Sequence, residues 1–284
     1  MITAIDAAEA QRILESPDLI AIGMRADEVR RQIHGTRTTF VRVFEIHADA
    51  VPSVLPDRVS AGEFRIGGRP ASIDAAVAAV RRAATLAAGG PVTGFSLEDL
   101  RTLAGPSFSD LCTALHDAGL HGIAETEVDR LHPGTAAAVV QARVCGLAVT
   151  RLTVRELPGE DRVNVVLRAR ELHDAVGGFR VFAPLPRSVS VAAPSTGYDD
   201  VKQVAIARLL ATGIDSIQVD WPLYGPKLAQ FALTIGADDV DGVAAVDPGT
   251  LGTRRSPLEE IRGNIRSAGL EPVERNARYE VIGR

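Results

Sequence analysis

Three polar residues that alternate along one segment are the first candidates for chemistry in this sequence. Glu45, His47 and Asp49 occupy every second position near the end of TTFVRVFEIHAD. If this segment is a strand, their side chains lie on one face at its carboxyl end. Two carboxylates and an imidazole suit Zn, Fe or Mn, so a replacement metal site is one alternative. Contact with an organic ligand is the second alternative, and ordinary solvation of a polar strand end is the third.

A second group of candidates lies in the segment IQVDWPLYGPK. Gln218 and Asp220 alternate on one face of a predicted strand, and Trp221 and Tyr224 follow them. An amide, a carboxylate and an aromatic ring suit a purine or aryl ligand, which needs both hydrogen bonds and stacking. The structural alternative is that Trp221 anchors the core or an interface while Asp220 caps the next helix.

The segment GADDVDG places further carboxylates at the end of another predicted strand. Asp239 and Asp241 suit ribose hydroxyls, whereas Asp238 and Asp239 also suit turn caps. Lys227, at a predicted helix start, suits an anionic group, although extension into solvent is commoner. The candidate substrate-binding residues are therefore Glu45, His47, Gln218, Asp220, Trp221, Asp239 and Asp241.

The elements that position these residues alternate between strand and helix. Strands are predicted over residues 38–49, 119–125, 147–156, 179–186, 214–223 and 238–246. Helices are predicted over residues 4–15, 18–34, 72–88, 97–105, 108–120, 133–145, 160–178, 197–213, 225–236 and 256–269. Between residues 52 and 72 the pattern is irregular, so the second strand–helix unit looks incomplete.

This alternation predicts βαβ units and a mainly parallel sheet. Six or more such units in 284 residues predict an α/β fold, a (βα) TIM-like barrel that is full or partly open. Residues 1–36 form a helical N-terminal extension. Because no linker rich in Pro, Gly or Ser interrupts the pattern, residues 1–284 are expected to form a single domain.

Charge and cysteine content narrow the class of protein. A formal charge of −5 and a pI of about 5.7 give no basic field for nucleic acid or an anionic membrane. No segment has the length and apolarity of a membrane span, and the first residues do not resemble a signal peptide. Cys112 and Cys145 are the only cysteines, which fits a reducing compartment. We therefore expect a cytoplasmic protein.

Three segments resemble a specific group of radical SAM enzymes. They are RADEVRRQIHGTRTTFVRVFEIHAD, TGYDDVKQVAIARLLATGIDSIQVDWPLYGPKLAQFALTIGADDVDG and SPLEEIRGNIRSAGLEPVERNARYE. The group comprises the aminofutalosine synthases and dehypoxanthine futalosine cyclases of menaquinone biosynthesis, and it is also similar to the FO synthases of deazaflavin biosynthesis. The resemblance is strong in the last third of the chain and weak between residues 62 and 115. It implies a barrel whose late strands line the substrate cavity.

The resemblance also implies a [4Fe–4S] cluster for which this sequence lacks ligands. Members of the group carry a CxxxCxxC motif after the first strand, and its three thiolates hold the cluster that cleaves S-adenosylmethionine (SAM). An ungapped comparison from TTFVRVFEIH puts Pro52, Pro56 and Val59 at these positions. None of these side chains has a donor atom. Residues 52–72 are thus interpreted as an eroded cluster loop, with the motif lost.

Two glycine-rich segments of the group also look altered. The strand end that receives the methionine part of SAM is compared with GGPVTGFS, which lacks a GGE pattern. A GGGAE-type segment corresponds to AGLHGIAETEV, where Glu125 or Glu127 remains as an acid. The pair Gly67–Gly68 in RIGGRP is interpreted as a turn. We therefore expect no cofactor: no iron–sulfur cluster and no SAM binding.

These observations predict a degenerate, radical SAM-like pseudoenzyme associated with the futalosine pathway of menaquinone biosynthesis. It would bind a nucleoside- or aryl-type intermediate or pair with an active radical SAM paralogue, without nucleic acid or membrane partners. The alternative is a cofactor-free barrel enzyme that uses Glu45, His47 or Asp220 in acid–base chemistry on a futalosine-like or aromatic substrate. A third hypothesis is a structural partner whose barrel mouth is filled by residues 52–62.

Overall fold

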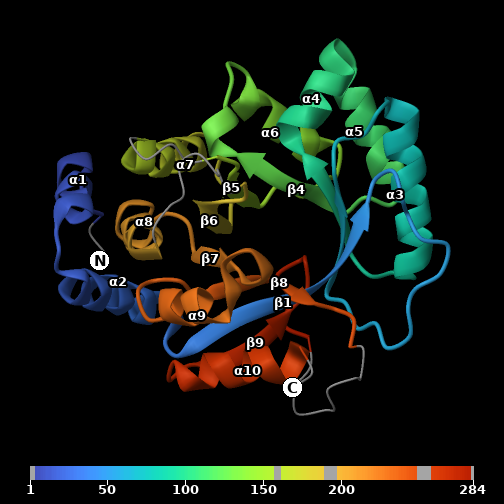
Figure 1. Ribbon diagram of the computed structural model, residues 1–284. Helices are drawn as coiled ribbons and strands as arrows, with labels where there is room; N and C mark the ends of the chain where they lie inside the picture. Colours follow the sequence, from blue (N-terminus) through green and yellow to red (C-terminus); the bar gives the residue numbers. More distant parts are fainter. Residues whose placement is uncertain (1–3, 157–160, 189–196, 248–256, 283–284) are drawn as a thin grey trace.

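Eight parallel strands close into a barrel surrounded by helices (Figure 1). The computed structural model describes residues 4–156, 161–188, 197–247 and 257–282. The sheet follows the order β2-β3-β4-β5-β6-β7-β8-β1, and β1 pairs back with β2 to complete the ring. The strands are β1 (Arg37–His47), β2 (Glu63–Gly67), β3 (Val92–Ser96), β4 (Gly122–Glu127), β5 (Arg151–Val154), β6 (Val181–Pro186), β7 (Ser216–Asp220) and β8 (Asp239–Ala244). The predicted TIM-like barrel is therefore confirmed, and it is closed.

A ninth strand joins the barrel at the amino end of β1. β9 (Glu271–Arg275) pairs in parallel with residues 37–41 of β1, whereas β2 pairs with residues 43–47. One edge of the long strand β1 is thus shared between two short strands. β9 brings Arg275 to the amino end of the barrel interior, where it meets Asp239 at the start of β8.

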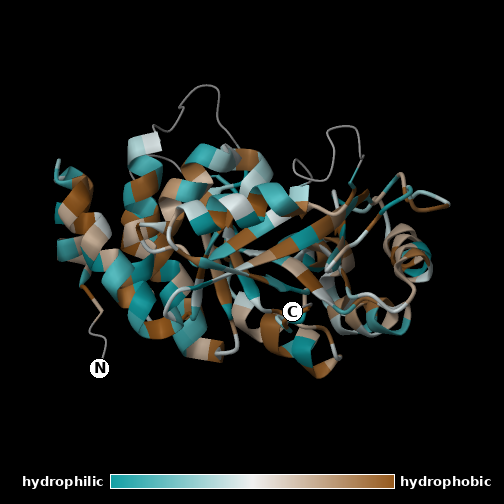
Figure 2. Ribbon diagram, turned by 90° about the horizontal axis from the view of Figure 1, so that it is seen from below, coloured by the Kyte–Doolittle hydropathy of each residue, from teal (hydrophilic) through white to brown (hydrophobic). Residues whose placement is uncertain are grey.

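Helices cover the outside of the barrel. They are α1 (Ala7–Glu15), α2 (Leu19–His34), α3 (Ile73–Ala87), α4 (Leu97–Ala104), α5 (Phe108–Asp117), α6 (Thr135–Val144), α7 (Arg162–Val176), α8 (Gly197–Leu210), α9 (Trp221–Leu233) and α10 (Pro257–Ser267), with two 3₁₀ turns, η1 (Gly105–Ser107) and η2 (Val128–Arg130). Hydrophilic and hydrophobic segments alternate along the helices in Figure 2, as expected of helices with one buried face. Among the described residues, no helix is long and apolar enough to span a bilayer.

Several helices begin at side chains that accept hydrogen bonds from the first turn. Asp6 caps α1, Asp18 caps α2, Ser72 caps α3 and Asp220 caps α9, with distances of 2.7–3.1 Å to the backbone nitrogens. Each of these side chains satisfies a backbone N–H that has no partner within the helix. The alternative role predicted for Asp220, as a helix cap, is therefore present in the structure.

The N-terminal helices α1 and α2 pack against α8. Lys202 donates from Nζ to the carbonyl of Leu14 over 2.6 Å, and Ile5 N–H donates to the carbonyl of Leu209 over 3.1 Å. Between this pair of helices and the barrel, every residue of α8 from Asp200 to Leu210 is buried. Burial on all sides explains why α8 shows no polar face in the sequence.

Charged residues of β2 face into the barrel, and its apolar residues face outwards. Glu63 and Arg65 bond to each other and to residues of other strands across the interior. Phe64 packs outside the ring, with its ring centroid 5.8 Å from that of Phe44 on β1. The expectation of an incomplete second unit is therefore wrong, because β2 and α3 form a regular strand–helix pair. What lacks regular structure is the preceding segment, residues 48–62.

Candidate ligand-binding site at the barrel mouth

A cavity of about 420 Å³ lies at the carboxyl ends of the early strands. Its lining comes from β2, β3 and β4 and from the residues that follow β4, β5 and β6. The charged residues of the lining are Arg65, Arg69, Asp99, Glu125, Arg130, Arg155 and Arg187. No residue of segment 52–62 belongs to this lining. Active sites of (βα) barrels occupy this end of the fold, so we take this cavity as the candidate site.

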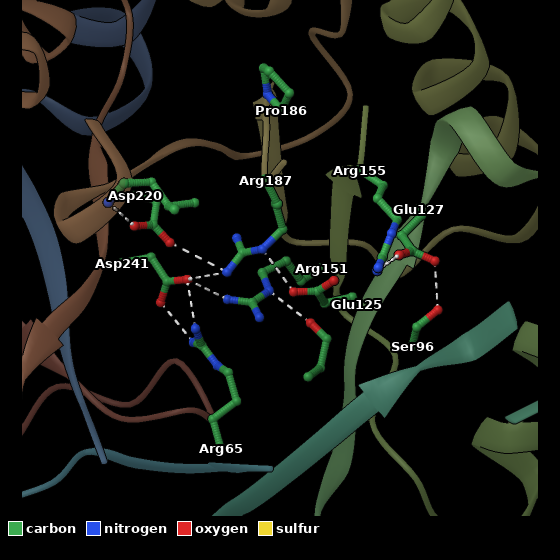
Figure 3. Close-up of polar contacts among 12 residues, drawn as sticks. Arg65, Ser96, Glu125, Glu127, Arg151, Arg155, Pro186, Arg187, Asp220 and Asp241 are labelled. Carbon is green, nitrogen blue, oxygen red and sulfur yellow. Dashed lines mark hydrogen bonds and ion pairs between the residues drawn. The ribbon is translucent and has the colours of Figure 1, made fainter. Parts of the chain in front are cut away.

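The floor of the cavity is a buried ion-pair network centred on Asp241 (Figure 3). Arg65 binds Asp241 through two hydrogen bonds of 2.7 and 2.9 Å and binds Glu63 through two of 2.8 Å. Arg151 adds a bond of 2.6 Å from Nη1 to Asp241. Burial alone would raise the pKa of Asp241, but Arg65, Arg151 and Arg187 hold it well below its usual range. The network keeps Asp241 ionised inside the barrel.

Arg187 lies between this floor and the open cavity. Its Nε is 2.8 Å from Glu125 and its Nη2 is 3.3 Å from Asp220. Burial and the neighbouring charge of Asp241 raise the pKa of Asp220, against the opposite effect of Arg187. The pKa values of the two carboxylates, Asp220 and Asp241, therefore move in opposite directions. Such divergence between neighbouring acids is typical of acid–base sites, although structural networks also produce it.

A second carboxylate, Glu127, organises the wall of the cavity. Its side chain is fully buried and accepts a hydrogen bond of 2.6 Å from the Ser96 hydroxyl. Arg130 and Arg155 contact it at 2.8 and 3.1 Å. Glu127 is one of the two acids that the sequence retained in AGLHGIAETEV, and its role here is to hold two arginines at the mouth.

The glycine pair at the mouth is Gly67–Gly68, not Gly89–Gly90. Gly67 ends β2 at its carboxyl end, whereas Gly90 precedes β3 and so lies at the opposite end of the barrel. Within GGPVTGFS, the end of β3 at Phe95 and Ser96 lines the cavity, but the Gly89–Gly90 pair does not. Gly68 has φ of +88°, and a Cβ there would lie 3.2 Å from His47 Nε2. Both facts favour glycine where the chain bends into the mouth.

Glu45 and His47 lie beside this glycine pair. The register of β1 against β2 pairs Glu45 with Arg65 and His47 with Gly67. Glu45, His47 and Asp49 are all exposed, and His47 Nδ1 is 3.8 Å from Asp49 Oδ2. Within the described residues no three His, Cys, Asp or Glu side chains are arranged to hold a metal ion. The geometry therefore lends the replacement metal site no support, and ligand contact stays a prediction.

Gln218 and Asp239 lie deeper than the other candidates and already have partners. Asp239 accepts two hydrogen bonds of 2.6 and 2.7 Å from Arg275, one from Gln218 and one from the Thr39 hydroxyl. Asp239 is the first residue of β8 and pairs in register with Gln218, the middle residue of β7. The bonds between Asp239 and Arg275 tie the chain after α10 to the base of the barrel. Gln218 donates to Asp239 through Nε2, while its buried Oε1 has no hydrogen-bond partner among the described residues.

Trp221 and Tyr224 belong to the first turn of α9. Trp221 is partly buried against the hydrophobic core, and neither ring lines the cavity at the mouth. The Tyr224 hydroxyl donates to the carbonyl of Pro186 on β6. These positions agree with the structural alternative, in which the aromatic residues anchor α9 to the barrel.

The residues expected at the cluster positions lie in the loop between β1 and β2. Pro52, Pro56 and Val59 have no side-chain donor, and Val59 makes an isolated antiparallel bridge with Val246 after β8. The only two cysteines are remote from this loop: Cys112 is buried in α5, and Cys145 follows α6. The donor set of this chain therefore does not fit a three-thiolate cluster at that position.

Part of this chain is similar to a family of known proteins. The model of the CofH/MqnC C-terminal region matches residues 183–283. Aminodeoxyfutalosine synthase from Streptomyces coelicolor is 37% identical over 142 residues, which cover 43% of this chain and 37% of the relative. The 5-amino-6-(D-ribitylamino)uracil–L-tyrosine 4-hydroxyphenyl transferase 1 of Methanosarcina barkeri is 34% identical over 166 residues, covering 51% of this chain and 43% of the relative. The resemblance predicted from the sequence is thus confirmed.

The matches span only about two-fifths of the length of those relatives. Solved structures extend the likeness of fold over almost the whole chain. Methylornithine synthase (PylB) has a TM-score of 0.65 at 13% identity and covers 95% of this chain and 94% of its own. HydG, a maturase of the [FeFe]-hydrogenase, has a TM-score of 0.62 at 16% identity and covers 98% of this chain and 74% of its own. At these identities the likeness concerns the fold alone.

Proposed function

We propose that this chain is a cluster-less, radical SAM-like barrel that binds a nucleoside- or aryl-type intermediate of the futalosine pathway of menaquinone biosynthesis. Pairing with an active radical SAM paralogue is part of the same proposal. The observation that carries it is the loop after β1, which contains no cysteine and in which the ungapped comparison with the family pattern puts Pro52, Pro56 and Val59 at the three cysteine positions. The mouth behind this loop nevertheless keeps a cavity of about 420 Å³, within the range of small-molecule sites.

The glycines and charged residues at the mouth support a retained binding role. Gly68 lets the chain bend close to His47 after β2, and Glu127 holds Arg130 and Arg155 in place. A barrel that served only as a scaffold would need neither the cavity nor this arrangement of donors. The scaffold hypothesis also assigns residues 52–62 to the mouth, and none of them lines the cavity.

Anaerobic reconstitution with iron and sulfide tests the absence of a cluster. We expect no stoichiometric iron, no absorbance near 400 nm above that of the untreated protein and no cleavage of SAM under reducing conditions. A triple variant with cysteine at positions 52, 56 and 59 is the matched control for the assay. A bound cubane in the unmodified protein that cleaves SAM would refute the proposal.

Calorimetric titration with futalosine-type nucleosides and aryl carboxylates tests the binding role. Saturable binding that raises the unfolding midpoint is the expected result, because a ligand that binds only the folded state stabilises it. Affinity capture from a strain that carries a radical SAM relative tests the paired form. If neither class of molecule nor a paralogue binds, the proposal fails.

One observation favours an acid–base enzyme as the second candidate function. Asp220 lies at the carboxyl end of β7, is largely buried and has a raised pKa because of burial and Asp241. A carboxyl group whose pKa is raised in this way is better suited to exchange a proton with a ligand than an ordinary aspartate. Turnover of a futalosine-like or aromatic substrate that disappears in Asp220→Asn while ligand binding persists would favour this function. Glu45 and His47, which are exposed at the mouth, are the accompanying candidates.

A further inference from the structure

Several arginine side chains at the cavity carry N–H groups that have no hydrogen-bond partner among the described residues. Five of its seven charged lining residues are arginines. Arg69 has no hydrogen-bond or ion-pair partner among the described residues, and Arg155 uses only Nη1, toward Glu127. Arg187 contacts acidic residues through Nε and Nη2, and its Nη1 has no hydrogen-bond partner among the described residues. Guanidinium groups can therefore offer further donors to an incoming molecule.

The carboxylates that line the cavity are already paired with arginines. Among the described residues, the acids in the lining are Asp99 and Glu125, and they pair with Arg130 and Arg187 at 3.2 and 2.8 Å. Glu127 lies fully buried behind Arg130 and Arg155. The buried acids set the positions of the arginines, as Figure 3 shows for Glu127 and Arg155. A solute in the cavity therefore meets guanidinium edges before it meets free carboxylate.

We propose that this cavity binds its ligand through an oxyanion, a carboxylate or a phosphate, held by Arg69, Arg155 and the free edge of Arg187. The inference rests on the proposed function, since it specifies the chemistry of the ligand assigned to the mouth. Guanidinium groups bind both oxyanions through paired, charge-assisted hydrogen bonds. Because buried partners already fix Arg155 and Arg187, less side-chain freedom is lost on binding. Phe95 lines the same cavity and offers an apolar contact to the rest of the ligand.

Matched pairs of small molecules separate the oxyanion from the body that carries it. The probes are AMP against adenosine, benzoate against benzyl alcohol, and inorganic phosphate alone, titrated calorimetrically at constant ionic strength. The anionic member of at least one pair is expected to bind roughly tenfold more tightly than the neutral member, which is the usual effect of one charge-assisted hydrogen bond. Tighter binding of AMP than of adenosine, together with binding of inorganic phosphate, identifies a phosphate site. Tighter binding of benzoate than of benzyl alcohol identifies a carboxylate site.

Arg69→Gln and Arg155→Gln should each reduce this preference several-fold, and Arg69→Lys should retain part of it. Both residues suit the test because Arg69 has no partner among the described residues and Glu127 keeps Ser96 and Arg130 when Arg155 is replaced. Arg82→Gln, on the exposed face of α3, removes the same charge far from the mouth and should leave the preference unchanged. The unfolding midpoint of each variant reports that the fold is kept.

The failures of the two proposals are distinguishable. If the neutral members bind as tightly as the anionic members, or if the preference survives in both glutamine variants, the oxyanion inference is wrong while the pocket stands. If no probe of either kind binds, both the inference and the ligand-binding role are wrong.

Discussion

Arg65 and Asp241 are joined by two hydrogen bonds across the inside of the barrel, at 2.7 and 2.9 Å. The two residues stand on β2 and β8, which flank β1 on opposite edges. Both side chains are buried, and each has a further partner, Glu63 for Arg65 and Arg151 for Asp241. The interior below the mouth is therefore filled by fixed ion pairs, which set the floor of the candidate site.

Asp241→Asn should destabilise the protein strongly. The change leaves Arg65 and Arg151 without a full counter-charge in a buried position, which typically costs about 3–5 kcal/mol. Urea unfolding at neutral pH measures the loss. Asp117→Asn, at an exposed position on α5, is the matched control and should change the free energy of unfolding by no more than about 0.5 kcal/mol.

Lowering the pH should remove much of the difference in free energy of unfolding between the wild type and Asp241→Asn. The pKa of Asp241 is lowered in the folded state, so its stabilising contribution is present above the ordinary aspartate pKa of about 3.9. That contribution is lost as the pH falls through the folded-state value. The two unfolding curves should therefore converge toward low pH. A difference that stays constant between pH 7 and acid would contradict the role given to Asp241.

The barrel class could be predicted from the sequence because its later strands and helices have the usual alternation. β2 was missed for a physical reason: its inward positions, Glu63 and Arg65, are charged, so the segment EFRIG lacks a recognisable apolar core face. β3 was missed because Gly94 weakens its strand pattern. β9 was missed because pairing with β1 depends on a contact more than two hundred residues away in the chain.

The candidate site was only partly predictable. Asp220 and Asp241 were named because carboxylates at strand ends are conspicuous, but the arginines that bind them were not. Arg65, Arg151 and Arg187 come from different strands, and no spacing in the sequence links them. The available signal was a charged residue inside a short apolar strand, as in EFRIG and RLTV, which indicates an inward ion pair when the strand is buried.

Asp239 and Arg275 should behave as a coupled pair at the base of the barrel. Each of Asp239→Asn and Arg275→Gln breaks a buried, two-bond ion pair and should cost about 3–5 kcal/mol. The double variant should cost less than the sum, with a coupling of about 1–3 kcal/mol, because neither charge remains unpaired. Urea unfolding of the wild type, the two single variants and the double variant measures this coupling in a double-mutant cycle. Strict additivity would mean that the chain after α10 is not held by this pair.

Gly68→Ala should lower the free energy of unfolding, whereas Gly67→Ala should leave it almost unchanged. Gly68 has φ of +88° and its new Cβ would lie 3.2 Å from His47 Nε2, whereas a Cβ at Gly67 meets no atom within 4 Å. A left-handed conformation costs a residue with a Cβ about 1–2 kcal/mol. The free energy of unfolding of both variants tests this contrast. Equal losses at the two positions would show that the bend at the mouth does not depend on glycine at position 68.

Asp220→Asn should change the pH dependence of stability while keeping the cap of α9. Asn caps helices about as well as Asp, so the bond from Leu223 N–H, 2.9 Å long in the wild type, can be replaced.

The pKa of Asp220 is raised in the folded state, so between the ordinary aspartate value and the raised value the native protein binds more protons than the unfolded chain. Stability of the wild type therefore falls as the pH rises through this window, and the variant lacks this fall. In urea unfolding from pH 4 to pH 7, the free energy of unfolding of the variant should therefore rise relative to that of the wild type as the pH rises. Asp18→Asn makes the same exchange at the exposed cap of α2 and reports the effect of the cap alone. If the free energy of unfolding of the variant instead falls relative to the wild type toward pH 7, Arg187 outweighs burial and the charge of Asp241, and the pKa of Asp220 is not raised in the folded protein.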